Sequence, residues 1–184
     1  MKVAGAVTLA DPTRTTETNH SWVVTDLQAR RGKALWGLVR RLDLDDEEAA
    51  DTVQEALLRL WRELSTGANI ADPDAWTFRV VYRLAMDEHR LRRSVRGVVD
   101  RVALAAAHRE PRDPTDGLAV WAEVDRLPAR QRAVLYLHYR ADLPYEAVGS
   151  ILGITANGAR NHASAALARL RGAFALSDGE QRWT

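Results

Sequence analysis

Tyr145 to Arg171 has the sequence YEAVGSILGITANGARNHASAALARLR, and this stretch decides the fold expected for the 184-residue chain. Apolar residues recur at helical spacing on both sides of Gly153, which predicts two helices joined by a tight turn. Pro144 suits the first position of the first helix, and Thr155 can cap the second. The positions expected to be buried are Val148, Ile151, Leu152, Ala159, Ala163, Ala166, Leu167 and Leu170. This pattern is typical of a helix-turn-helix.

Polar side chains occupy the remaining faces of the predicted second helix. They are Thr155, Asn157, Arg160, Asn161, His162 and Ser164. Side chains of these types contact base edges and bind phosphates in DNA. The alternative is an ordinary helical hairpin with a solvated polar face, and the stretch favours DNA binding over it.

Composition limits the classes of protein that this chain can be. Hydrophobic residues make up 46% and charged residues 28%, which is typical of a soluble globular protein. The absence of cysteine excludes disulfides, thiol catalysis and cysteine zinc sites. The sequence has no apolar run long enough to span a bilayer and no signal-peptide pattern, so we expect a cytoplasmic protein without a metal or cofactor.

Charge is distributed unevenly, although the formal net charge is only +1. Seven acidic residues and no basic one lie between Asp43 and Glu55, whereas Arg79 to Arg96 holds six arginines against two acids. Leu118 to Ala175 holds seven arginines and four acids. One acidic and two basic segments predict a protein partner at one surface and nucleic acid at the others.

The acidic segment predicts a helix with a possible docking face. Asp45 to Glu48 has the spacing of a capping box, and the helix is expected to run to about Leu64. Its predicted buried stripe is Val53, Leu57, Leu60 and Leu64. Leu58 and Trp61 lie off that stripe beside charged side chains, so they either widen the core face, which the pattern favours, or bind another protein.

The first basic segment predicts a helix from Asp74 to about Arg93 that begins after Asp72 and Pro73. Its core face is expected to consist of Val80 or Val81, Leu84, Ala85 and Leu91. Another face carries Arg79, Arg83, Asp87 and Arg90, with Trp76, Phe78 and Tyr82 interleaved. Arginines bind a phosphate backbone and aromatic rings stack on unpaired bases, which suits single-stranded nucleic acid. Trp76 and Phe78 can also belong to the core.

We predict an all-α protein of two small helical domains, because no strand pattern competes. Ser21 to Arg41 is expected to be a helix, and Val98 to His108 a weak one. Two prolines and five charges between Arg109 and Asp116 indicate a linker. The expected division is a flexible tail (1–20), a first domain (21–97), a linker (98–116), a helix-turn-helix domain (117–175) and a C-terminal tail (176–184).

Three segments resemble bacterial RNA polymerase sigma factors of the sigma-70 family, in particular the two-domain, extracytoplasmic-function (ECF) type. Asp51 to Arg62, DTVQEALLRLWR, resembles their helix that binds core polymerase. Ala75 to Arg93, AWTFRVVYRLAMDEHRLRR, resembles their promoter-melting helix. Leu127 to Leu135, Leu143 to Ile154 and Ala166 to Arg171 resemble their reader of the −35 element. Three motifs in the right order are strong evidence for the family.

The resemblance implies a non-enzymatic initiation factor with core RNA polymerase, promoter DNA and an anti-sigma factor as partners. The partner would be the β′ and β subunits of core polymerase, and the residues that would bind the clamp of β′ are Asp51, Gln54, Glu55, Leu58 and Trp61. Those that would hold and open the −10 element are Trp76, Arg79, Arg83, Asp87, Arg90, Arg92 and Arg93. The polar residues of the predicted second helix would read the −35 element.

Three positions depart from the family pattern. Arg83 stands where many relatives have an asparagine that lines the pocket for a flipped base. His162 and Ala165 stand where cations are common, and histidine is mostly neutral near pH 7. Arg160 keeps the cation at its position. The departures predict −35 binding that is weaker or directed to a different sequence, and Arg83 leaves the preference at the −10 element open.

Three other classes compete with this interpretation. A LuxR-type helix-turn-helix regulator would act without core polymerase, but its receiver domain would need strands and acidic phosphorylation residues. An enzyme would need a catalytic motif, and the five histidines are scattered without a metal-ligating or phosphate-binding pattern. An interaction protein with a degenerate DNA reader stays open because the predicted recognition helix is altered.

Overall fold

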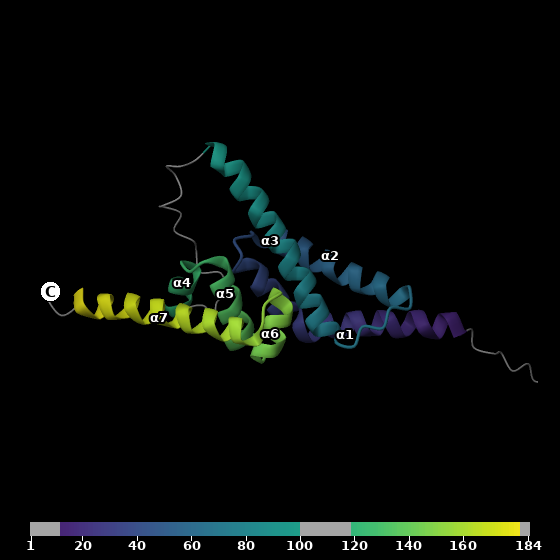
Figure 1. The fold of residues 1–184 in the computed structure, drawn as a ribbon. Coiled ribbons are helices and arrows are strands. Elements are labelled where there is room, and N and C mark those ends of the chain that lie inside the picture. The colour runs from purple at the N-terminus through teal and green to yellow at the C-terminus, as the bar shows by residue number, and fades with distance from the viewer. Residues whose placement is uncertain (1–11, 100–118, 181–184) are drawn as a thin grey trace, which may run out of the picture.

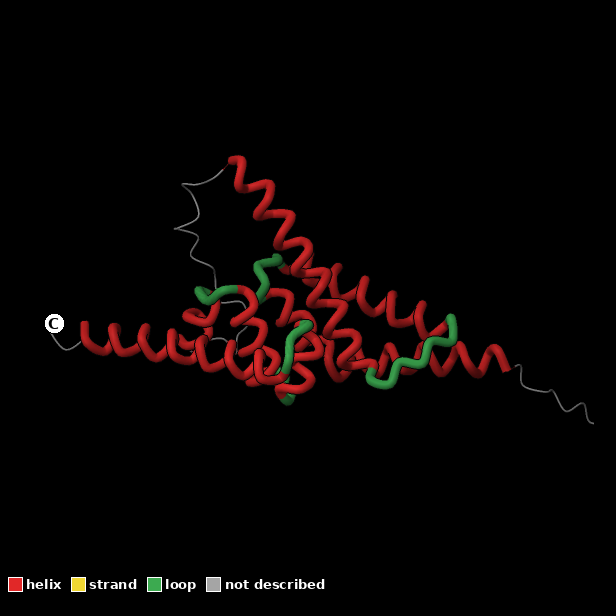
Figure 2. Tube along the Cα trace, viewed as in Figure 1, coloured by secondary structure: helices red, strands yellow, loops and turns green. Residues whose placement is uncertain are grey.

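The computed structural model describes residues 12–99 and 119–180, with the side chains of residues 20–91 and 120–175. These residues form helices and no strand, which confirms the all-α prediction (Figure 2). In chain order the helices are α1 (Pro12–Arg40), α2 (Asp46–Ser65), α3 (Pro73–Val99), α4 (Ala119–Asp125), α5 (Ala129–Leu135), the π-helix η2 (Tyr136–Arg140), α6 (Tyr145–Leu152) and α7 (Ala156–Glu180).

The first three helices pack against one another and form an N-terminal unit. The predicted capping box starts α2: the Glu48 N–H donates to Asp45 Oδ1 at 2.9 Å, and the Asp45 N–H donates to Glu48 Oε2 at 2.8 Å. The large, fully buried side chains of this unit include Leu27, Leu35, Leu38, Leu60, Phe78 and Val81. Apolar stripes at helical spacing on all three helices therefore meet in one core.

Both long helices of this unit exceed their predicted bounds. α1 begins at Pro12, so residues 12–20 of the predicted tail are helical. Extending a formed helix adds one hydrogen bond for each residue ordered, whereas a new helix needs a costly nucleus. α3 continues to Val99, beyond the predicted end at Arg93, and projects past α1 and α2 (Figure 1). Leu91, in the C-terminal half of α3, is 60% exposed, so its assignment to the core was wrong.

The C-terminal unit consists of the helices from α4 onward and contains the predicted helix-turn-helix, α6 and α7. Gly153 ends α6 in the left-handed conformation, with φ of 68°. The Thr155 hydroxyl caps α7 and accepts a hydrogen bond from the Gly158 N–H at 3.0 Å. Pro144 lies one position before the helix, as its N-cap, rather than at its first residue. The turn chemistry was otherwise predicted correctly because it is local.

The two units share one continuous core. α3 contacts α6, and α1 contacts η2. Gly37 of α1 lies so close to the ring of Tyr136 that a Cβ there would overlap the Tyr136 hydroxyl. Figure 1 shows α3 between α2 and the α6–α7 pair. Apolar spacing in the sequence predicts the buried face of each helix, but it does not predict which faces of the two units pack together.

Two buried ion pairs join the units, and each unit supplies one arginine and one aspartate. Arg132 of α5 donates from both Nη atoms to both carboxylate oxygens of Asp43, at 2.7 and 2.8 Å. Arg41 donates to Asp125 of α4 at 2.9 Å, and its guanidinium lies 4.9 Å from the Trp121 ring centre. Both arginine side chains are only 4% exposed. We refer to these two contacts as the inter-unit ion pairs.

Candidate polymerase-binding and DNA-binding surfaces

The angle between α6 and α7 depends on a close backbone contact at Gly149. A Cβ added there would lie 2.8 Å from the Ile154 carbonyl oxygen and 3.0 Å from the Ala156 backbone nitrogen. Both neighbours are backbone atoms of the turn and cannot rotate away. The contact places the start of α7 against α6, and so sets where the polar side chains of α7 point.

Gly149→Ala is expected to lower the free energy of unfolding by about 1–3 kcal/mol, because overpacked side chains force the backbone to shift. Gly172→Ala is the matched control: it lies within α7 with open space around it and is expected to be stabilising by about 0.5–1 kcal/mol. Urea unfolding of both variants measures the difference. Equal stability of the two variants would show that the turn does not need a glycine.

The predicted −35 residues form one exposed row on α7, with two exceptions. Asn157, Arg160, Asn161 and Ser164 are exposed and recur at steps of three and four residues. The Thr155 hydroxyl is used as the helix cap, and His162 is half-buried off the row. The structure therefore presents four polar side chains together on the first turns of α7.

Within this row, Arg160 contacts two residues at the start of α6. Its Nη2 donates to Glu146 Oε1 at 2.6 Å, and its guanidinium lies 5.4 Å from the Tyr145 ring centre. The pKa of Glu146 is lowered, first by the hydrogen bond from its own backbone N–H and then by Arg160, so its carboxyl group is ionised at neutral pH. Sequence patterns could not indicate this contact, which joins residues 14 positions apart.

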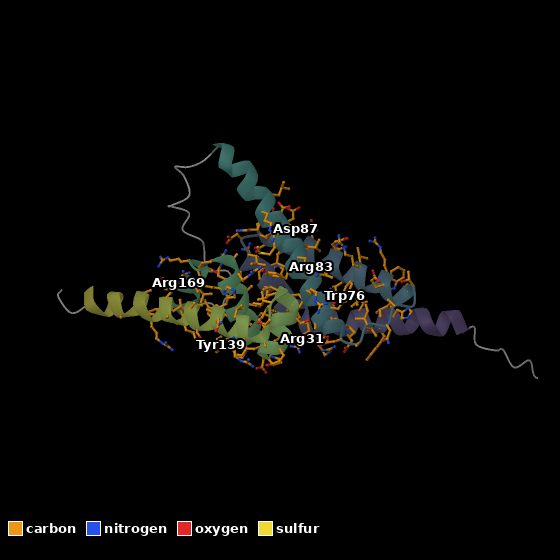
Figure 3. All side chains as sticks on the ribbon, in the orientation of Figure 1. Arg31, Trp76, Arg83, Asp87, Tyr139 and Arg169 are labelled. Carbon is orange, nitrogen blue, oxygen red and sulfur yellow. The ribbon has the colours of Figure 1, made fainter. Side chains whose placement is uncertain are left out.

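The predicted −10 residues lie along α3, and Figure 3 shows Trp76, Arg83 and Asp87 in line on this helix. Arg83, Asp87 and Arg90 are exposed, and Arg90 donates to Asp87 at 3.3 Å. Phe78 and Tyr82 are buried in the core, whereas Trp76 is half-buried. Of these three aromatic side chains, only that of Trp76 therefore has exposed surface on which a base could stack. The side chains of Arg92 and Arg93 lie outside the described residues.

Arg79, also predicted to hold the −10 strand, contacts the helix-turn-helix in this structure. Its Nε donates to the Ser150 carbonyl oxygen at 3.2 Å, and its Nη2 to the Ser150 hydroxyl at 2.5 Å. Residues 79 and 150 are 71 positions apart, so sequence periodicity could not reveal the contact. It places the face of α3 directly against α6.

The predicted docking face on α2 is exposed. Leu58 and Trp61 are each 42% exposed, and Asp51 and Gln54 lie on the surface beside them. Glu55 is partly covered and accepts a hydrogen bond from Arg59 at 2.7 Å. The alternative that Leu58 and Trp61 widen the core is therefore wrong. Exposed apolar side chains rimmed by charge are typical of protein interfaces.

An ion-pair cluster that the sequence did not indicate fixes the start of α3 against α1. Asp74 accepts hydrogen bonds from Arg30 at 3.1 Å and from Arg31 at 2.9 Å. Partial burial raises the pKa of Asp74, but the two arginines outweigh it and the net shift is downward. The cluster therefore stabilises the fold at pH values above the ordinary pKa of a carboxyl group. Its contribution is lost as the pH falls through the lowered pKa of Asp74.

Within residues 12–99 and 119–180, no helix combines the length and apolarity needed to cross a bilayer. The same part of the chain contains no group of three metal-ligating side chains close enough to hold an ion. The surfaces on α2, α3 and α7 are thus the candidate sites in the described residues.

Comparison with known proteins assigns the two units. Residues 27–95 match the family model of Sigma-70 region 2, and residues 117–170 match that of Sigma-70, region 4. The ECF RNA polymerase sigma factor SigL of Mycobacterium tuberculosis is 30% identical over 142 residues, which cover 74% of this chain and 80% of SigL. The chain belongs to the ECF sigma factors of the sigma-70 family. The region 2 match contains α2 and most of α3, and the region 4 match contains the helix-turn-helix.

Other relatives agree with the assignment to ECF sigma factors. ECF RNA polymerase sigma factor SigJ of M. tuberculosis is 33% identical over 168 residues, covering 85% of this chain but 53% of SigJ. The chain thus spans about half the length of SigJ. The solved structure of the sigma factor RpoE with the anti-sigma factor NepR from Bartonella quintana has a TM-score of 0.63 and 22% identity, covering 80% of this chain and 93% of that one. CnrH in complex with the cytosolic domain of CnrY has a TM-score of 0.61 and 21% identity, covering 89% and 95%. The two structures share the fold.

Proposed function

We propose that this chain is an alternative sigma factor that binds core RNA polymerase and directs initiation at specific promoters. The observation that supports this most directly is that the two sigma-70 regions match, in order, the two units that carry the three exposed surfaces. The polymerase would bind the face of Asp51, Gln54, Glu55, Leu58 and Trp61 on α2. RNA synthesis itself would remain with the polymerase, and this chain would act without enzymatic activity of its own.

The two DNA surfaces have different chemistry and, in the proposal, different duties. α3 combines exposed arginines with the half-buried Trp76, which suits an opened strand whose bases stack on aromatic rings. α7 presents amides, a guanidinium and a hydroxyl near its N-terminus, where a recognition helix contacts base edges in the major groove. We assign the −10 element to α3 and the −35 element to α7.

Binding both elements at once requires the two units to separate. The elements are named for positions about 25 nucleotides apart, which is roughly 85 Å of B-form DNA at about 3.4 Å per base pair. In the structure Arg79 of α3 contacts Ser150 of α6, so the two surfaces lie beside each other. The structure is therefore a closed arrangement, and we propose that binding to the polymerase and promoter opens it.

Trp76→Ala is expected to leave duplex binding intact and to reduce promoter opening by the polymerase, because stacking on one base contributes about 1–3 kcal/mol. Permanganate reactivity of unpaired thymines, with core polymerase present, measures opening, and a mobility shift measures the closed complex. Trp22→Ala, which removes an exposed tryptophan from α1, is the matched control and should leave both unchanged. Equal loss of both signals in Trp76→Ala would reject a separate melting surface.

An anti-sigma factor and a cytoplasmic location complete the proposal. The two solved structures were determined with a bound partner, named as an anti-sigma factor for RpoE, and both share this fold. A LuxR-type regulator is not favoured, because residues 27–95 match Sigma-70 region 2 where a receiver domain would stand. The domain boundaries at 97 and 117 remain predictions, since most of 98–116 lies outside the described residues.

A further inference from the structure

Arg160, the base-contacting cation of the proposed reader, is held by neighbours on α6 rather than free in solvent. Its Nη2 donates to Glu146 Oε1 at 2.6 Å, and its guanidinium lies 5.4 Å from the Tyr145 ring centre. One nitrogen of the guanidinium is thus engaged by a carboxylate. A guanidinium has five N–H donors, so the second N–H of Nη2 and the donors on Nη1 and Nε remain available to a further acceptor.

The support of Arg160 continues behind the Tyr145 ring. Tyr145 stacks on His138 of η2, with ring centres 3.9 Å apart and planes inclined by 23°. His138 Nδ1 in turn lies 2.8 Å from the Leu143 carbonyl oxygen. The ring that Arg160 contacts is therefore fixed by the turn before α6. A long flexible side chain is held at two points by groups that belong to a rigid part of the unit.

We propose that Glu146 is a specificity-determining positioning residue, which orients Arg160 so that its remaining N–H edge reads one base of the −35 element. This inference rests on the proposed function. Bidentate contact with the O6 and N7 atoms of guanine needs two coplanar donors in a defined direction, and a carboxylate that holds one N–H of Nη2 fixes the direction of the two-donor edge that remains. Because Glu146 is negative, it also weakens attraction to every phosphate nearby.

A purely structural role does not explain the contact. Arg160 and Glu146 are 50% and 66% exposed, and exposed ion pairs contribute little to folding stability. Removing the carboxylate charge should leave the unit folded. A positioning role therefore predicts that removing this charge changes the discrimination between bases. A purely structural role predicts no change in discrimination.

The test uses the full chain bound to core polymerase and a duplex selected by the parent complex from a randomised −35 region. Dissociation constants are measured for that duplex and for every single-base change in it, with parent, Glu146→Gln and Arg160→Ala. Asp142→Asn is the matched control, because it removes the same charge from the loop before α6. Each protein is also checked for its unfolding midpoint.

We expect Glu146→Gln to bind most duplexes as tightly as the parent or more tightly, and to lose discrimination at one base position by about fivefold or more. The position should be the one at which Arg160→Ala loses preference, and Glu146→Gln should add nothing there in the Arg160→Ala background. Asp142→Asn should change affinity without changing that preference.

Four results would overturn the inference. Unchanged discrimination in Glu146→Gln would show that the carboxylate charge does not position Arg160, and improved discrimination would show that this charge masks Arg160. If Arg160→Ala loses preference at no position while the complex still opens promoters, the positioning role falls but the proposed initiation function stands. If the parent complex neither selects a duplex nor opens DNA, both fail.

Discussion

Asp43→Asn combined with Asp125→Asn is expected to open the two units of the free protein. Each substitution removes the carboxylate charge of one inter-unit ion pair, and breaking a buried ion pair in this way is destabilising by about 3–5 kcal/mol. The ratio of closed to open molecules should therefore fall by about a hundredfold or more. Asn tolerates the left-handed backbone that Asp43 adopts, with φ of 75°, so the turn after α1 should persist.

The absence of cysteine makes this opening measurable with spin labels. The exposed residues Ala50 on α2 and Ala168 on α7 are replaced by cysteine, which places one label on each unit. The parent should give one short, narrow distance distribution, and the double variant a longer, broader one. Asp46→Asn is the control, since Asp46 pairs with Arg40 within the N-terminal unit at 2.7 Å. A narrow distribution in the double variant would show that the ion pairs do not hold the closed form.

A second large effect is expected when Asp51, Gln54 and Leu58 are changed together to alanine. A small number of anchor residues carries most of the binding energy of an interface, and truncating one of them costs about 2 kcal/mol or more. The triple variant should therefore bind core polymerase at least about a hundredfold more weakly. All three side chains are exposed, so the N-terminal unit should keep its helical content and unfolding midpoint.

Co-elution with core polymerase on size exclusion, followed by a titration of a labelled chain, measures the loss. Glu63→Ala is the control, because Glu63 is an exposed acid on α2 about a third of a turn from the docking face. It should bind core as the parent does. A folded triple variant that still binds core as tightly as the parent would place the interface elsewhere.

Features that depend on neighbours in sequence could be predicted. The capping box at Asp45, the Thr155 cap and the turn at Gly153 each depend on residues within four positions, and all three are present. The exposure of Leu58 and Trp61 was one of two alternatives, because both lie off the apolar stripe. Pattern alone could not separate Phe78 from Trp76, since both are aromatics in the first turns of α3 and only packing decides which is covered.

Features that depend on distant residues could not be predicted. The inter-unit ion pairs join positions 84 and 89 residues apart. In the sequence, each of the four residues is indistinguishable from an ordinary charged surface residue. The requirement for Gly37 arises from Tyr136, which lies on a π-helix that periodicity cannot distinguish from an α-helix. The hydrogen bonds from Arg79 to Ser150 likewise depend on how the two units pack against each other.

Permanganate footprinting of a cognate promoter, with and without core polymerase, tests the proposed function most directly. Unpaired thymines should appear around the −10 element only when the chain and core polymerase are both present, because α2 must bind the polymerase before α3 can hold an opened strand. Tight binding of the chain alone to duplex DNA, with no thymine exposed when core is added, would contradict an initiation factor and would favour a conventional helix-turn-helix regulator.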